Sequence, residues 1–540
     1  MQENRVVAVF AMFLICFALL LCRLTSLSTN AVYAQAANRQ AEFVLPMDGG
    51  RGNFFDCHFT PLTGAGTQNN LLMEPTAESY YQMFDVVFPD NRDELYEGIQ
   101  KSKPFLLPIQ EESKDAVQAS LVFPRVKRYL PLPIACHLLG YVDGEEKGIA
   151  GLEYACDALL KGGSTTRVVS GVTNVYGALA AKSKPRVIAT QGTGKGIMLT
   201  IDATLQRVCE AIAAATMDKG SIVVIETETG RVRASVSMPQ FAPEQIAQSL
   251  QKNDTSLINR STSSYSVGSV FKPLLAAAAL ENGIDPEEIY SCDGDIEVDG
   301  HTYRCAYGKG HGEVNLQQAL AQSCNCYFVQ LGLRLGGETI LSYAENAGFG
   351  ESTPIYGTLR TARGNLPTVQ TLHNTGELAS ISFGQGQLMA TPVQVASFIN
   401  LFANDGVYIA PTFVEGVVNE YTKSMEKSLY APIYRQTVAP ETAEAMRKML
   451  VQVITDGLGK SAAPYSGGAG GKTGTAQTGR RDAAGDEHMD AWFAGFYPAE
   501  NPQYTIAVLL DSGTHSGDDA GKIFAKVANA LRFFLSDVDN

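Results

Sequence analysis

The first pattern along the chain is an apolar run close to its N-terminus. Residues 6–22 contain no charged side chain, and one arginine flanks each end of the run. This length is at the short end for a membrane-spanning helix. A cleaved signal peptide is the alternative, but its candidate cleavage residues, Ala34 and Ala36, lie far beyond the apolar run. We therefore expect residues 1–24 to form a retained signal anchor, with the remainder of the chain extracytoplasmic.

Between the anchor and residue 190 the hydrophobic pattern is mixed, with short strands, turns and some helix. Residues 25–39 are polar and compatible with a stalk, and residues 182–196 are rich in Lys, Gly, Thr and Pro, which predicts a linker. The single histidine His137 lies among apolar residues and is interpreted as structural. The pattern predicts one domain over residues 25–190 and a second over residues 191–540.

The second domain has strand patterns at both ends and helix patterns between them. Asp202 is expected to cap a helix over 203–217. Apolar and β-branched runs predict strands at 221–225, 231–236, 491–496 and 504–511. Further helices are predicted from Ser269 onward and at 314–331, 338–347, 393–404, 440–453 and 523–535. This order predicts an α+β domain in which helices flank one antiparallel sheet.

Composition adds a few limits. A chain of 540 residues is expected to form two or three domains, and its net charge of -14 argues against a nucleic-acid partner. Cys292 and Cys305 flank a predicted hairpin, and outside the cytoplasm they could form a disulfide. Their spacing does not decide whether the disulfide forms. No Cys-x-x-Cys pair or histidine cluster has the usual zinc spacing, so neither a metal nor a cofactor is expected.

The candidate chemistry begins with Ser269 and Lys272, which are three residues apart and would share one face of a helix. Serine is a weak nucleophile until a base accepts its proton, and lysine can act as that base when burial lowers its pKa. Such a pair is common by chance. Two later segments make it more specific: Ser323-Cys324-Asn325 and Lys472-Thr473-Gly474-Thr475.

Ser-x-x-Lys, Ser-x-Asn and Lys-Thr-Gly in this order are the signature of penicillin-binding proteins and serine β-lactamases. With Asn259-Arg260, His311-Gly312 and the turn Gly384-Gln385-Gly386, the chain resembles the class B penicillin-binding proteins, which are monofunctional peptidoglycan D,D-transpeptidases. Two features depart from the family pattern: Cys324 stands where the motif usually has Asp, and Cys57-His58 stands where a charged turn is usual.

The resemblance extends, more loosely, to the front domain through Arg51-Gly52 and residues 148–153. It implies a transmembrane helix, then an elongated mixed α/β pedestal of the dimerisation type. A penicillin-binding, β-lactamase-like transpeptidase domain follows. It also implies that the enzyme is anchored in the cell membrane by a single pass.

The resemblance also implies a role for each motif residue. Ser269 would attack the carbonyl between two terminal D-alanines and Lys272 would accept its proton. Ser323 would shuttle a proton, and Asn325 would hold Lys272 and the substrate amide. The third segment would bind the substrate carboxylate through Lys472, Thr473 and Thr475, while Gly474 allows close approach. Backbone N–H groups of Ser269 and Thr475 would form an oxyanion hole.

The implied partners are a stem peptide ending in D-Ala-D-Ala, an amine acceptor, β-lactams that acylate Ser269, and a membrane glycosyltransferase. A D,D-carboxypeptidase shares all three motifs. A serine β-lactamase is disfavoured because the chain has no Glu-x-x-Leu-Asn stretch after the second motif. A bifunctional synthase is disfavoured because the front domain is short. The non-enzymatic alternative is a β-lactam sensor or a cell-wall scaffold.

Overall fold

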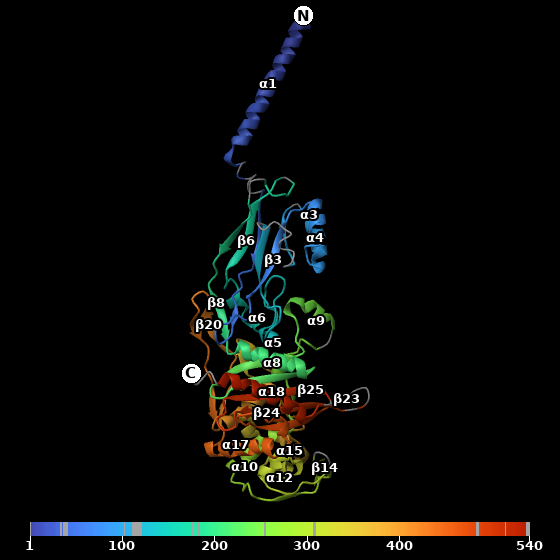
Figure 1. Cartoon of the computed structure of the whole chain (residues 1–540), viewed down its shortest axis with the longest axis vertical. Coiled ribbons are helices and arrows are strands. Elements are labelled where there is room, and N and C mark those ends of the chain that lie inside the picture. Colours follow the sequence, from blue (N-terminus) through green and yellow to red (C-terminus); the bar gives the residue numbers. More distant parts are fainter. Residues whose placement is uncertain are drawn as a thin grey trace. The chain divides into compact units, whose positions relative to one another are not determined.

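The computed structural model describes residues 2–32, 35, 41–101, 103–110, 121–174, 176–180, 184–252, 255–305, 309–481, 485, 487–513 and 515–535. The chain divides into two compact units. Many of the helices and strands are labelled in Figure 1. The first comprises Met1–Arg51, Gly64–Arg128 and Gly162–Thr193, and the second comprises Gly52–Thr63, Tyr129–Lys161 and Gly194–Asn540. Ala34 and Ala36, considered above as a cleavage site, lie outside the described residues.

The N-terminal apolar run forms helix α1 (Gln2–Thr29). Its part from Asn4 to Thr29 is long and apolar enough to cross a membrane, with a mean hydropathy of 2.7 in its most apolar window, and it is the one such helix among the described residues. The apolar side chains of this helix are exposed on all sides, as expected for a helix whose surroundings are not protein.

The first unit contains two antiparallel sheets, each with three strands. One has the order β1 (Glu42–Asp48), β6 (Thr166–Val172), β7 (Arg186–Thr190), and the other has the order β4 (Phe105–Pro108), β3 (Gly66–Met73), β5 (Val122–Lys127). Helices α3 (Ala77–Met83) and α4 (Arg92–Ile99) complete the unit. The predicted linker over 182–196 was therefore wrong at residues 186–190, because β7 pairs with β6 along its whole length.

The division into units differs from the predicted boundary between residues 190 and 191. Phe54, Leu62, Leu138 and Leu152 all belong to the hydrophobic core of the second unit, although they precede that boundary. The last change of unit along the chain is at Gly194. The roles of pedestal and transpeptidase domain remain predictions for these parts of the chain.

A five-stranded antiparallel sheet forms the centre of the second unit, in the order β10, β9, β25, β24, β23. Its strands are β9 (Gly220–Glu226), β10 (Val232–Met238), β23 (Gly470–Arg481), β24 (Glu487–Tyr497) and β25 (Tyr504–Gly513). β23 lies at one edge, paired only with β24. The predicted antiparallel sheet is thus confirmed, and its edge strand carries the Lys472-Thr473-Gly474-Thr475 segment.

Side chains of the sheet alternate between two helical layers, because successive residues of a strand point to opposite faces. On β24, Phe493 packs against Phe524 of α18 (Gly517–Leu535). Its neighbour Trp492 belongs to the opposite core, together with Phe398 of α16 (Pro392–Ala403). Helix α8 (Ala203–Thr216) shares the face of α18, and Asp202 caps it by accepting from the Leu205 N–H, as predicted.

The remaining elements of the second unit build the helical layers and small hairpins. The helices are α5 (Cys136–Leu139), α6 (Gly151–Ala155), α7 (Asp157–Leu160), α9 (Ile246–Lys252), α10 (Lys272–Glu281), α11 (Leu316–Ala321), α12 (Asn325–Leu335), α13 (Gly337–Asn346), α14 (Val369–Leu372), α15 (Thr375–Ile381) and α17 (Pro440–Thr455). A four-stranded sheet has the order β2 (Phe54–Phe55), β8 (Lys195–Leu199), β20 (Val414–Asn419), β21 (Ser424–Ser428). Two-stranded pairs join β11 (Tyr265–Ser266) to β18 (Met389–Ala390), β12 (Tyr290–Cys292) to β15 (Gly312–Val314), β13 (Asp295–Val298) to β14 (His301–Arg304), β16 (Pro354–Tyr356) to β17 (Leu359–Arg360), and β19 (Val407–Ile409) to β22 (Tyr434–Gln436).

One predicted helix is wrong in an informative way. Residues 314–331 do not form a single helix: α11 ends at Ala321 and α12 begins at Asn325. Between them Ser323 has a φ of 55°, a left-handed conformation that a helix interior does not allow. The break turns the chain within the Ser323-Cys324-Asn325 motif.

Candidate active site

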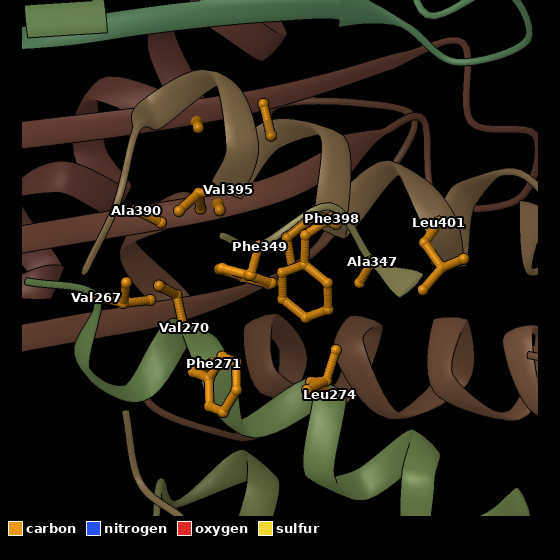
Figure 2. Packing of buried hydrophobic residues seen from close by; sticks show 14 of the residues in the cluster. Val267, Val270, Phe271, Leu274, Ala347, Phe349, Ala390, Val395, Phe398 and Leu401 are labelled. Atoms are coloured by element: carbon orange, nitrogen blue, oxygen red, sulfur yellow. The ribbon is translucent and has the colours of Figure 1, made fainter. Parts of the chain in front are cut away.

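The segment that carries Ser269 is a short 3₁₀ turn, Gly268–Phe271, which leads directly into helix α10. In a 3₁₀ turn residues three apart are eclipsed, so Ser269 and Lys272 lie on the same side. Ser269 is partly exposed, whereas Lys272 is fully buried. Val270, Phe271 and their neighbours pack into the core beneath, where Phe271 meets Phe349 edge-on (Figure 2).

Two contacts hold the start of this turn. The Gly268 N–H donates to the Gly384 carbonyl at 2.8 Å, and a Cβ at Gly384 would lie 1.8 Å from the Gly268 oxygen. The Gly384-Gln385-Gly386 turn therefore requires glycine at its first position. On the other side, the indole Nε1 of Trp492 donates to the Ser266 carbonyl at 2.8 Å.

Lys272 reaches the second motif. Its Nζ lies 2.7 Å from the Ser323 carbonyl oxygen, 3.2 Å from Ser323 Oγ and 2.6 Å from Asn325 Oδ1. Within the described part of the chain, no hydrogen bond joins Nζ to Ser269. Burial lowers the pKa of Lys272 to about 8, against the smaller opposing effect of nearby cysteines. At this pKa about a tenth of the lysine is an uncharged amine at pH 7, far more than for a lysine in water.

The second motif is oriented from both sides. The Cys324 side chain caps α12 by accepting from the Tyr327 N–H at 3.4 Å. The Asn325 Nδ2 donates to the Arg304 carbonyl at 2.9 Å, which leaves its Oδ1 for Lys272. The left-handed Ser323 places both its carbonyl and its hydroxyl beside Lys272.

The third motif lies on the edge strand β23, directly against the 3₁₀ turn. A Cβ on Gly474 would meet Val270 Cγ1 at 3.0 Å and Val270 N at 3.2 Å, so the two backbones approach closely. Thr475 is exposed, and its Oγ1 accepts from the Gly517 N–H at 3.3 Å. Thr473 is buried. An edge strand leaves backbone N–H and C=O groups free for an added peptide.

Lys472 is also fully buried, and its Nζ donates to the carbonyl and hydroxyl oxygens of Thr473 at 3.1 and 3.2 Å. Burial holds the pKa of Lys472 well below its usual range, and the charge of Lys272 lowers it further. The two lysines are therefore close enough to disfavour double protonation. A bound carboxylate would restore the charge on Lys472.

A cavity of about 510 Å³ lies beside these segments, where β23 continues beyond Thr475. Its lining is mostly polar and comes from β11, β18, β23, β24 and the loops next to them. It consists of Ser264, Tyr265, Ser266, Asn365, Gly386, Gln387, Met389, Gln477, Thr478, Gly479, Arg480 and Asp490.

The three predicted motifs thus come together in one unit. The second motif contacts Lys272 directly, and the third packs on the turn that bears Ser269. His137, predicted to be structural, is partly buried; its Nε2 lies 2.7 Å from the Ser256 carbonyl oxygen, and burial lowers its pKa to about 4. Sequence reasoning missed the supports of the site, Trp492 and the Arg304 carbonyl. The sequence offered one signal for Trp492, which is the single tryptophan of the chain.

This arrangement, a partly exposed serine with a buried lysine beside an antiparallel edge strand, is the candidate active site. The model of the penicillin-binding protein transpeptidase domain matches residues 220–530, more than half of the chain. The chain belongs to the family of penicillin-binding protein transpeptidases, which confirms the resemblance.

Several known proteins are similar. Stage V sporulation protein D of Bacillus subtilis is 29% identical over 417 residues, covering 74% of this chain and 62% of that protein. The peptidoglycan D,D-transpeptidase MrdA of Acinetobacter baumannii is 28% identical over 444 residues, covering 73% of this chain and 65% of that protein. The chain spans just under two thirds of the length of these relatives.

Solved structures show the same fold. The crystal structure of penicillin binding protein 3 from Mycobacterium tuberculosis in its apo form has a TM-score of 0.66 at 23% identity, covering 92% of this chain and 97% of that one. The D,D-transpeptidase domain of a peptidoglycan glycosyltransferase from Eggerthella lenta has a TM-score of 0.65 at 22% identity, covering 90% and 98%. The predicted α+β architecture is thereby confirmed.

Proposed function

We propose that this chain is a serine D,D-transpeptidase that cross-links peptidoglycan stem peptides. The observation that carries the proposal is the set of hydrogen bonds at Lys272. A neutral amine has two N–H groups, and the Ser323 carbonyl and Asn325 Oδ1 can accept both. The lone pair then remains for a hydroxyl, which is what a base for serine requires.

The reaction has two halves. Ser269 Oγ attacks the carbonyl between the two terminal D-alanines and passes its proton to Lys272. Ser323 relays this proton to the leaving nitrogen, and the C–N bond breaks with release of D-alanine. An amine of a second stem peptide then attacks the acyl-enzyme; it loses a proton through the same groups, and Ser269 is regenerated. The Ser269 hydroxyl must turn toward Nζ when substrate binds, since catalytic hydrogen bonds commonly tighten only in the complex.

The third motif binds the donor peptide in this proposal. The free edge of β23 would receive the peptide as an added strand. Lys472, Thr473 and Thr475 would hold its terminal carboxylate, and Lys472 regains its proton when the carboxylate arrives. The N–H groups of Ser269 and Thr475 would stabilise the oxyanion; such donors typically contribute about 3 kcal/mol each.

Location and partners follow from the same proposal. Helix α1 would anchor the protein in the cell membrane by a single pass, with the catalytic unit outside the cytoplasm. Residues 25–190 would act as a non-catalytic pedestal. The glycan strands would come from a membrane glycosyltransferase, the partner that the resemblance to class B penicillin-binding proteins implies.

The test is covalent labelling followed by product analysis. The purified protein and its Ser269→Ala variant are incubated with a fluorescent penicillin, with Ser291→Ala, an exposed serine outside the site, as the matched control. We expect labelling of the wild type and of Ser291→Ala only. Equal labelling of Ser269→Ala would end the proposal.

Product analysis separates the related activities. With a synthetic stem pentapeptide and an amine acceptor, a transpeptidase forms a cross-linked dimer together with released D-alanine. D-alanine without dimer would identify a carboxypeptidase, and rapid turnover of the penicillin would identify a β-lactamase. A protein that is labelled but forms no product would be a sensor or scaffold.

A further inference from the structure

Four side chains that commonly bind metals meet behind the Ser323-Cys324-Asn325 segment. They are Cys292, Cys305, His311 and Cys324, and their ligand atoms all lie within 4.8 Å of one another. Cys292 and Cys305 are free thiols with their sulfurs 3.6 Å apart, so the disulfide that the sequence left open is not formed here. None of the four has a role in the proposed mechanism.

The distances fit one small ion. A tetrahedral zinc site with Zn–S bonds of about 2.3 Å places its sulfurs about 3.8 Å apart, and its nitrogen about 3.6 Å from each sulfur. The observed separations are 3.6 Å for Cys292–Cys305, 3.7 Å for Cys305–Cys324, and 3.4 Å from Cys292 Sγ to His311 Nδ1.

The four side chains come from separate elements of the fold. Cys292 ends strand β12 and faces Gly312 of β15, which directly follows His311. Cys305 follows β14, where its N–H donates to the Gly294 carbonyl at 2.8 Å. Cys324 stands at the N-terminus of α12 as its cap. Two hairpins and a helix start therefore converge on one point.

Backbone N–H groups beside the cluster would stabilise a thiolate, the form of cysteine that binds metals. Cys305 Sγ accepts from the backbone N–H groups of Asn325 at 3.1 Å and Cys326 at 3.5 Å. The N-terminus of α12 adds a positive partial charge at Cys324. Cys292, Cys305 and Cys324 are buried with 2%, 4% and 0% exposure, so thiolates at these positions would require a cation as partner.

We propose that Cys292, Cys305, His311 and Cys324 bind one zinc ion in a closed, four-coordinate structural site. Three sulfurs and one imidazole suit zinc, and four protein ligands leave no open position for a catalytic water. This replaces the expectation of no metal. That expectation rested on local Cys-x-x-Cys spacing, whereas these ligands are brought together only by the tertiary structure.

The site would stabilise the catalytic segment. Cys324 lies between Ser323 and Asn325, which both contact Lys272. Arg304, whose carbonyl orients Asn325, directly precedes Cys305. An ion bound to Cys305 and Cys324 would therefore fix the strained Ser323 and the Asn325 amide together. The bound metal would position the catalytic groups without touching the substrate.

The experiment measures metal content in the full-length protein. The chain is purified in detergent without oxygen, supplied with zinc, dialysed, and analysed by mass spectrometry for metals. We compare Cys292→Ala and Cys305→Ala with Cys209→Ala, a buried cysteine of α8 in a different core cluster. One zinc per chain is expected in the wild type and in Cys209→Ala, with at least a tenfold loss in the other two variants.

A second readout works even where a variant folds poorly. Wild-type protein loaded with cobalt in place of zinc should show the thiolate charge-transfer band and the strong visible bands of a tetrahedral site. Chelation of zinc from the wild type should lower the midpoint of thermal unfolding, and added zinc should restore it. Both measurements use no substrate, so they remain informative if the proposed transpeptidase activity fails.

Several outcomes would overturn the site. They are a wild type without zinc after reconstitution, zinc retained in both Cys292→Ala and Cys305→Ala, and a disulfide among these cysteines in the oxygen-free preparation. Iron with acid-labile sulfide in the purified protein would replace zinc by a cluster, and would equally reject the proposal.

Discussion

Lys272 Nζ and Asn325 Oδ1 lie 2.6 Å apart, and the Asn325 amide is held in this orientation because its Nδ2 donates to the Arg304 carbonyl. The amide oxygen can accept from the amine in either protonation state without adding a charge. A neutral partner therefore orients Lys272 and leaves its pKa lowered by burial. Aspartate at this position would add a negative charge that raises the pKa of Lys272, whereas asparagine does not.

Replacing Asn325 by aspartate tests this relationship. In Asn325→Asp the shape is kept, but a carboxylate faces the amine and stabilises its protonated form. We expect the pKa of Lys272 to rise to about 9 or above, with acylation by penicillin at neutral pH falling at least about tenfold. The rate should recover as the pH is raised. Asn325→Ala is the control: it loses the contact without adding charge, so its pH dependence should stay near that of the wild type.

The wild-type pH profile is a separate prediction. Lys272 acts as a base only when it is deprotonated, and burial lowers its pKa to about 8. The second-order rate of acylation should therefore rise about tenfold per pH unit below that value and level off above it. Stopped-flow measurement with a chromogenic β-lactam between about pH 6 and pH 9.5 gives the profile. A flat profile below pH 8 would contradict a lysine base.

The sequence predicted the residues of the site better than their arrangement. Local spacing identified Ser269 and Lys272, and apolar and β-branched runs identified four of the five strands of the central sheet. The break at Ser323 was missed because the apolar spacing of a helix continues through it. Likewise, the cluster of Cys292, Cys305 and His311 with Cys324 exists only because separate hairpins meet a helix start. Contacts between distant segments leave no periodic pattern in the chain.

Contacts between distant segments also explain why the observed division into units differs from the predicted boundary. Leu138 and Leu152 precede the predicted boundary, yet they are buried in the second unit. Their helices are short, and composition alone does not indicate which core receives them. Residues 186–190 lie within a segment that is rich in Lys, Gly, Thr and Pro as a whole, but they pair as a strand along β6. Pairing partners, like core partners, are decided outside the local sequence.

The turn Gly384-Gln385-Gly386 offers a prediction with a matched control. Gly384 has a φ of 84°, and an added Cβ would meet the Gly268 carbonyl oxygen at 1.8 Å. Gly283 has a φ of 70°, but an added Cβ there meets nothing within 4 Å. Gly283→Ala should lower the free energy of unfolding only by the backbone strain, about 1–2 kcal/mol.

Gly384→Ala adds the clash to the same strain and should displace the turn that bears Ser269. We expect a lower thermal unfolding midpoint than for Gly283→Ala, and acylation slowed at least about tenfold, since misplacement by an ångström or less is costly in catalysis. Acylation at the wild-type rate in Gly384→Ala would show that the Gly268–Gly384 contact does not position the nucleophile.

Ser323 allows backbone strain to be separated from chemistry. Ser323→Ala and Ser323→Gly both remove the hydroxyl that lies 3.2 Å from Lys272 Nζ, so both should slow acylation by about 100-fold or more. Only glycine relieves the left-handed φ of 55°. Glycine loses more conformational entropy on folding than alanine, which offsets part of this gain. The free energy of unfolding of Ser323→Gly should still be about 0.5–1 kcal/mol higher than that of Ser323→Ala. Thermal unfolding and acylation rates measured on the same preparations separate the two effects. If Ser323→Gly restored acylation, the role of this residue would be to shape the turn, and the proton relay would have to be assigned elsewhere.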